Sequence, residues 1–186
     1  MIVVDDFIRD KKLLDIFSNI DNWRCLIDIA NHKTFENIAD IEDEHIKKLI
    51  DDVSNKFWQD YDDPGEYEYW VNVIAKDGIL EWHKDKDEFL ARNDKYVYPT
   101  IGAVWYGHPS ISNIEGGYLE FKRKNNEIER IEPVYNRLVV FDSSKFHRVA
   151  PVIEGTRIAL SFCMWEKNIT AVRRRSKNIG VYGVRI

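Results

Sequence analysis

The chain has 186 residues, of which 44% are hydrophobic, 13% aromatic and 32% charged, and its formal net charge is −5 at pH 7. This length and composition indicate one globular domain with a sizeable core and exclude a disordered or low-complexity protein. The two cysteines, Cys25 and Cys163, cannot form a disulfide framework. That favours a reducing compartment, so we expect a cytoplasmic protein. We find no secretory signal and no apolar run of about 18 residues, so we expect no membrane contact.

The charge is distributed unevenly along the chain. Six of the 27 basic residues and none of the 32 acidic ones lie in residues 167–186, including the run Arg173-Arg174-Arg175. A basic tail on an acidic body could bind nucleic acid. We favour the alternative that the tail folds against the acidic body or is simply solvated, because three adjacent arginines are a weak signal.

Residues 1–65 carry helical patterns and are interpreted as a helical support region. A short amphipathic helix is predicted around residues 13–20, and a longer one precedes the turn Asp63-Pro64-Gly65. Asp40 is the expected N-cap of the longer helix. Its apolar stripe follows the spacing i, i+3, i+4, i+7 and i+11, with Ile46, Leu49, Ile50, Val53 and Phe57.

Residues 66–186 change to short β-rich runs separated by turn residues, and end in the basic tail. Such spacing predicts an antiparallel sandwich or barrel, with the N-terminal helices packed outside one sheet in one integrated domain. We therefore expect an α+β fold that is mainly β. The predicted strands are Glu66–Ala75, Ile79–His83, Val97–Gly107, Gly117–Arg123, Ile128–Glu132, Asn136–Asp142, His147–Val152 and Thr156–Trp165.

Two histidines and a carboxylate are candidates for a metal site. His83 and Asp85 are two residues apart at a strand end, so their side chains can point to the same side. His147 follows a strongly apolar strand and could supply a third ligand from the opposite sheet. Two histidines and one carboxylate leave coordination positions open, as non-haem Fe(II) oxygenases require. Each residue alone also fits a solvated strand end or a core-edge histidine.

Arg157 strengthens this interpretation. If the last predicted strand alternates regularly, Arg157 shares a face with Ala159, Ser161 and Cys163. An arginine pointing into an apolar sheet interior is costly unless an anion meets it, and a planar guanidinium suits a carboxylate. Ser161 could add a hydroxyl donor. The competing possibility is that Arg157 faces solvent and pairs with an acid on a neighbouring strand.

From about Tyr69 to Trp165 the chain resembles the 2-oxoglutarate- and Fe(II)-dependent dioxygenases, particularly the prolyl-4-hydroxylase-like branch. The resemblance implies a double-stranded β-helix (a distorted jelly roll). It is carried by His83-Lys84-Asp85, by Gly116-Gly117-Tyr118-Leu119-Glu120-Phe121, by Asn136-Arg137-Leu138-Val139-Val140-Phe141-Asp142, by Phe146-His147-Arg148-Val149, and by Gly155-Thr156-Arg157-Ile158-Ala159-Leu160-Ser161.

The resemblance also implies roles for particular residues, with 2-oxoglutarate and O₂ as co-substrates. Fe(II) would be bound by His83, Asp85 and His147. Arg157 would bind the distal carboxylate of 2-oxoglutarate beside Ser161, and Leu119 and Asn72 would also contact this co-substrate. The chain departs from many relatives, which have tyrosine where Val73 stands and tryptophan where Cys163 stands.

The activity expected from this resemblance is hydroxylation of a C–H bond in a peptide, protein or amino-acid-like substrate, with proline as one candidate. An AlkB-like nucleic-acid dealkylase is a second hypothesis, although the second arginine and the asparagine typical of that branch do not follow Arg157. A non-catalytic jelly-roll binding module is a third. A zinc hydrolase or cupin-like isomerase would keep the metal and change its use.

Overall fold

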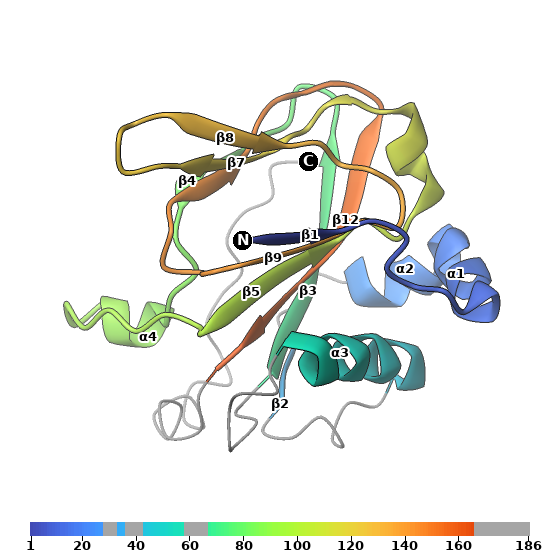
Figure 1. Ribbon diagram of the computed structural model, residues 1–186, viewed down its shortest axis with the longest axis horizontal. Helices are drawn as coiled ribbons and strands as arrows, with labels where there is room; N and C mark the ends of the chain where they lie inside the picture. The colour runs from blue at the N-terminus through green and yellow to red at the C-terminus, as the bar shows by residue number, and fades with distance from the viewer. Residues whose placement is uncertain (28–32, 36–42, 58–66, 166–186) are drawn as a thin grey trace.

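A computed structural model describes residues 1–27, 33–35, 43–57 and 67–165 (Figure 1). In this part of the chain, antiparallel strands form two main sheets that face each other. Helices α1, α2 and α3 lie on one side of the larger sheet, and the strands of the smaller sheet lie on its other side. The predicted mainly β architecture with helices outside one sheet is therefore confirmed.

The larger sheet has six strands in the order β1-β9-β5-β12-β3-β2, and all of its neighbours are antiparallel. Its longest strands, β12 and β3, pair along their whole length, and β12 is one of the two central strands of the sheet. The bounds are β1 Ile2–Val4, β2 Lys33–Phe35, β3 Tyr67–Ala75, β5 Ile101–Trp105, β9 Leu138–Phe141 and β12 Thr156–Met164.

The smaller sheet has four antiparallel strands in the order β4-β10-β7-β8, so β4 is an edge strand whose neighbour is β10. A separate two-stranded ladder joins β11 to β6. The bounds are β4 Leu80–His83, β6 Glu115–Gly116, β7 Leu119–Lys122, β8 Ile128–Ile131, β10 His147–Val149 and β11 Val152–Glu154.

The helices begin at side chains that accept their first backbone N–H groups. Asp10 caps α1 through Lys12 N and Leu13 N. The predicted N-cap of the long helix was wrong: α3 begins at Glu44, and the Asp43 carboxylate accepts from His45 N and Ile46 N. Asp40 itself lies outside the described residues.

None of the described helices is long and apolar enough to cross a membrane. The bounds are α1 Lys11–Ser18, α2 Ile20–Ile27, α3 Glu44–Phe57, α4 Glu88–Ala91 and the 3₁₀ helix η2 Pro109–Asn113.

Two apolar clusters fill the two sides of the larger sheet. One lies between this sheet and helices α1–α3, and it includes the predicted stripe of α3 together with Ile158, Leu160 and Phe162 of β12. The other lies between the two sheets and includes Ala159. Strand β12 therefore alternates as predicted, with odd-numbered residues toward the space between the sheets. This alternation is what brings Arg157 and Ser161 into the interior.

Each predicted β run contains a strand, but the run over residues 147–152 splits into β10 and β11 of different sheets. Strands β1, β2 and β6 were not predicted because they are three residues long or shorter. Helix α4 was missed in the segment after Asp85, and the turn at residues 63–65 and the basic tail lie outside the described residues.

Candidate metal and co-substrate site

His83 and His147 lie side by side on neighbouring strands. They are direct partners in the antiparallel pairing of β4 with β10, and their ring centroids are 4.3 Å apart. The prediction that His147 comes from the opposite sheet was therefore wrong. Both histidines belong to the smaller sheet, because the chain returns after β9 to pair directly with β4. The opposite sheet supplies Arg157 instead.

Backbone carbonyls fix the orientation of both rings. Nδ1 of His83 lies 2.7 Å from the carbonyl oxygen of Glu81, and Nδ1 of His147 lies 2.9 Å from that of Lys145. A carbonyl oxygen can only accept, so each Nδ1 carries the hydrogen and each Nε2 keeps its lone pair. Anchoring one ring nitrogen in this way is typical of histidines that bind metal through the other.

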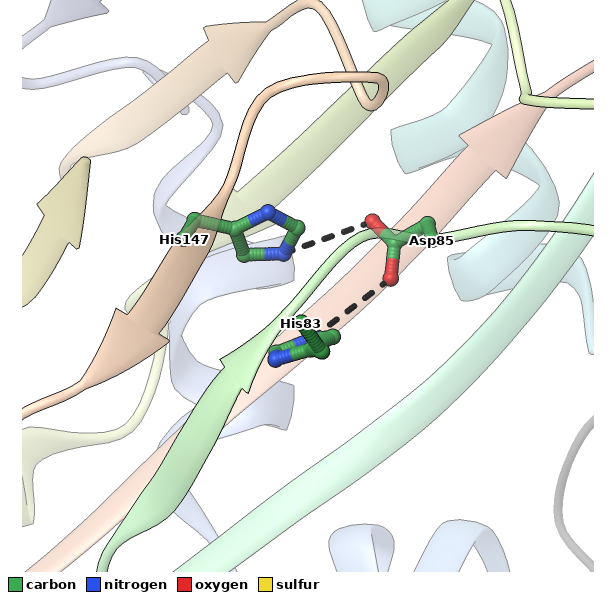
Figure 2. A group of neighbouring side chains, drawn as sticks. All are labelled: His83, Asp85 and His147. Carbon is green, nitrogen blue, oxygen red and sulfur yellow. Dashed lines mark ion pairs between the residues drawn. The ribbon is translucent and has the colours of Figure 1, made fainter. Parts of the chain in front are cut away.

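Asp85 completes the group from the segment that follows β4 (Figure 2). Its two carboxylate oxygens lie 3.7 Å from Nε2 of His83 and 3.5 Å from Nε2 of His147. The three residues offer ligand atoms that all lie within 4.8 Å of one another. Ligand atoms bound at about 2.1 Å to a common ion lie at most about 4.2 Å apart, so a small closure around an ion suffices. The donor set of two imidazoles and a carboxylate fits Fe(II).

Burial keeps both histidines neutral. Burial is the largest cause that lowers the pKa of each ring. For His83, the positive charge that His147 would carry when protonated lowers the pKa further. The carbonyl contacts at Nδ1 oppose this effect on each pKa without reversing it. A neutral imidazole is the form that binds a metal ion, so the site is ready to bind near pH 7.

The metal-free protein should lose stability as the pH falls below about 6.5. The unfolded histidines take up protons near 6.5, whereas the folded ones resist protonation until lower pH. The unfolded state therefore binds more protons in this window, and each histidine contributes a slope of up to about 1.4 kcal/mol per pH unit. Urea unfolding between pH 7.5 and 5.5 measures this slope. A double variant, His83→Gln with His147→Gln, should flatten this slope. An unchanged slope would show that the two histidines are not its source.

Arg157 is a buried cation without an acidic partner among the described residues. Its side chain is 1% exposed, which rules out the solvent-facing alternative. Nε donates to the carbonyl of Gly117 at 3.2 Å, and Nη2 donates to the Tyr106 hydroxyl at 3.1 Å. The guanidinium also lies 5.0 Å from the centre of the Tyr106 ring. Nη1 has no hydrogen-bond partner in the described part of the chain. A buried charge without a counter-charge is energetically costly, so this position favours the binding of an anion.

One cavity between the two sheets joins the candidate metal ligands to Arg157. All seven predicted site residues line it, namely Asn72, His83, Asp85, Leu119, His147, Arg157 and Ser161. Asn72 donates to the Ser161 hydroxyl at 2.9 Å, so these two polar side chains act together. The remaining lining is largely apolar and comes from both sheets, with Trp70, Leu80, Ala103, Val104, Phe141, Val149 and Phe162.

Sequence reasoning missed two residues that hold Arg157. Tyr106 directly follows β5, and its alternation with Val104 was the available signal that it faces the interior. Gly117 contributes its carbonyl, with φ of +65°. A Cβ there would lie 2.9 Å from Ile114 Cδ1 and 3.3 Å from Arg157 Cδ, so a side chain would press on the guanidinium arm.

Two facing antiparallel sheets that enclose two imidazoles, a carboxylate and a buried guanidinium define a metal-dependent enzyme of the double-stranded β-helix class. The family model of the 2OG-Fe(II) oxygenase superfamily matches residues 69–165, just over half of the chain. The chain belongs to this superfamily, and is therefore an oxidoreductase that uses Fe(II) and 2-oxoglutarate. No curated protein matches it.

Solved structures of prolyl hydroxylases share this fold. A prolyl-4-hydroxylase from Pseudomonas putida is 16% identical with a TM-score of 0.62, over 90% of this chain and 92% of that one. A viral collagen prolyl hydroxylase from Paramecium bursaria Chlorella virus-1, in complex with 2-oxoglutarate, is 17% identical with a TM-score of 0.60, over 89% and 96%. A prolyl hydroxylase from Trichoplax adhaerens is 16% identical with a TM-score of 0.60, over 88% and 82%. The expected double-stranded β-helix and the prolyl-4-hydroxylase-like resemblance are confirmed.

Proposed function

We propose that this protein hydroxylates a C–H bond in a peptide, protein or amino-acid-like substrate, with Fe(II) held by His83, Asp85 and His147. The single observation that carries the proposal is the pairing of features in one cavity. Three metal-binding side chains lie at one part of it, and the buried Arg157, which has no carboxylate partner among the described residues, lies at another. A co-substrate that chelates a metal and carries a second carboxylate matches both features.

Each group has a separate task in this proposal. When bound, Fe(II) supplies the chemistry by which O₂ is activated as 2-oxoglutarate is converted to succinate and CO₂. Arg157 binds the distal carboxylate through Nη1, while Tyr106 and Gly117 keep the guanidinium in place. The Asn72–Ser161 pair and Leu119 line the same cavity, polar on one side and apolar on the other. The apolar wall excludes water from the reacting atoms.

Two of the structural neighbours favour a peptide substrate. One is a collagen prolyl hydroxylase, and another was solved with a peptide fragment of the hypoxia-inducible factor oxygen degradation domain. We carry the peptide class to this chain as part of the proposal, with proline as the first residue to test. The helices α1–α3, packed on the far side of the larger sheet from the cavity, are proposed to support the fold and not the chemistry.

Succinate formation tests the substrate class. Protein loaded with Fe(II) should form more succinate from 2-oxoglutarate when proline-containing peptides are added, and mass spectrometry should find peptides heavier by one oxygen atom. A matched set of peptides with alanine in place of proline is the control for the residue. Methylated single-stranded oligonucleotides are the competing substrate. Turnover with the oligonucleotides alone would overturn the peptide proposal in favour of the dealkylase hypothesis.

A further inference from the structure

A row of side chains crosses the outer face of the smaller sheet, directly behind the metal ligands. It consists of Trp82 on β4, Arg148 on β10, Glu120 on β7 and Arg130 on β8, and we call it the back-face row. Arg148 is the register partner of Glu120, and Glu120 is that of Arg130. Trp82 and Arg148 each stand one residue from a candidate ligand, His83 and His147. The row therefore involves all four strands of the sheet.

A single buried carboxylate holds the row together. Glu120 is 1% exposed, and its two oxygens accept from Nε of Arg148 at 2.6 Å and from Nε of Arg130 at 2.5 Å. Burial pushes the pKa of Glu120 up, but the two arginines outweigh this effect and hold the pKa below its ordinary value. Short contacts between charged groups in a shielded place are among the stronger hydrogen bonds of proteins. Arg148 is thus fixed firmly to β7.

The same arginine reaches the strand that carries His83. The guanidinium carbon of Arg148 lies 4.7 Å from the centre of the Trp82 ring, within the range of a cation–π contact. Strand β4 needs such support, because it is an edge strand and its register with β10 shifts between His147 and Val149. An irregular ladder on one side only leaves the position of β4 weakly determined by backbone hydrogen bonds alone.

We propose that Arg148 is a positioning residue that sets the spacing of His83 and His147 by clamping Trp82 against the back of the sheet. This inference rests on the proposed metal role of the two histidines. The described contacts of the Arg148 guanidinium are with Glu120 and Trp82 and not with either imidazole, so Arg148 acts through the strands. Supporting groups around metal ligands typically change metal affinity by about 10- to 100-fold when they are removed.

Metal binding separates this role from a general contribution to stability. Replacing Arg148 by leucine removes the ion pair and the cation–π contact but keeps an aliphatic side chain. We expect the affinity for Mn(II), measured by calorimetry without turnover, to fall by about 10- to 100-fold. The variant Trp82→Leu should give a similar loss, and Arg148→Lys, which keeps a cation over the indole, should recover much of it. Chemical unfolding of each variant measures the stability change.

Two other arginines provide matched controls on the same sheet. Arg130 pairs with Glu120 from the side away from β4, and Arg123 pairs with Glu129 at 3.0 Å in the β7–β8 hairpin. Arg130→Leu and Arg123→Leu should change Mn(II) affinity by less than about threefold, within the range of a surface ion pair. Equal losses of affinity in Arg148→Leu and Arg130→Leu, or none in Arg148→Leu and Trp82→Leu, would overturn the inference. Failure of the unaltered protein to bind Mn(II) would instead overturn the metal site itself.

Discussion

Replacing His147 by alanine is expected to abolish succinate formation and to weaken Fe(II) binding by more than about 100-fold. The Nε2 of this residue is one of the three proposed ligand atoms, and its ring orientation is fixed by the carbonyl of Lys145. Alanine cannot replace the nitrogen, and the remaining His83 and Asp85 would form an incomplete site. Even groups that only support metal ligands change affinity by about 10- to 100-fold, so loss of a ligand should exceed that range.

His108→Ala is the matched control for this experiment. His108 caps the 3₁₀ helix η2 and lies against Trp23, and it does not line the cavity that contains the proposed metal ligands. Its replacement should leave Fe(II) affinity within about twofold, although it removes a cap. Circular dichroism of both variants shows whether each is folded. A folded His147→Ala protein that still binds Fe(II) normally and forms succinate would refute the metal assignment.

Arg157→Ala should raise the 2-oxoglutarate concentration needed for half-maximal succinate formation by about 30-fold or more. Truncating one member of a buried, hydrogen-bonded charge pair costs about 2–5 kcal/mol, and about 1.4 kcal/mol corresponds to a factor of ten. The Mn(II) affinity measured without 2-oxoglutarate should stay close to that of the unaltered protein, because Arg157 lies on β12 of the opposite sheet and is not one of the proposed ligands.

Tyr106→Phe separates the charge of Arg157 from its orientation. The variant keeps the ring below the guanidinium and removes the hydroxyl that accepts from Nη2. One neutral hydrogen-bond partner contributes about 0.5–1.5 kcal/mol, so the 2-oxoglutarate requirement should rise by about tenfold at most. If Arg157→Ala leaves the 2-oxoglutarate requirement unchanged, Arg157 has no role in binding the co-substrate.

The inward position of Arg157 could be predicted from the sequence because it depends on local rules. Regular alternation along one long strand puts Arg157 and Ser161 on the same side, and the pattern of apolar neighbours says that this side is the interior. The apolar stripe of α3 was equally local, since helical spacing alone identifies it. The closeness of His83 and Asp85 could be predicted from their separation of two residues alone.

Features that depend on which strands are neighbours could not be predicted in this way. Whether His147 joins the sheet of His83 is decided by hydrogen bonds between strands far apart in the chain. The contact of Tyr106 with Arg157 likewise depends on the pairing of β5 with β12, which no local pattern encodes. The N-cap of α3 was misplaced for a different reason. Asp40 and Asp43 both carry a carboxylate that can cap a helix, and it is the Asp43 carboxylate that accepts from the first backbone N–H groups.

The position of Arg157, the proposed co-substrate arginine, depends in part on a main-chain carbonyl and not only on side chains. Because Gly117 offers a carbonyl from a left-handed conformation with little room for a β-carbon, nearly any exchange at this position should displace Arg157. A scan of point variants would then score Gly117 as harmful although it has no functional group of its own. If Arg157 binds the diacid as proposed, the loop before β7 can change little in sequence without loss of co-substrate affinity.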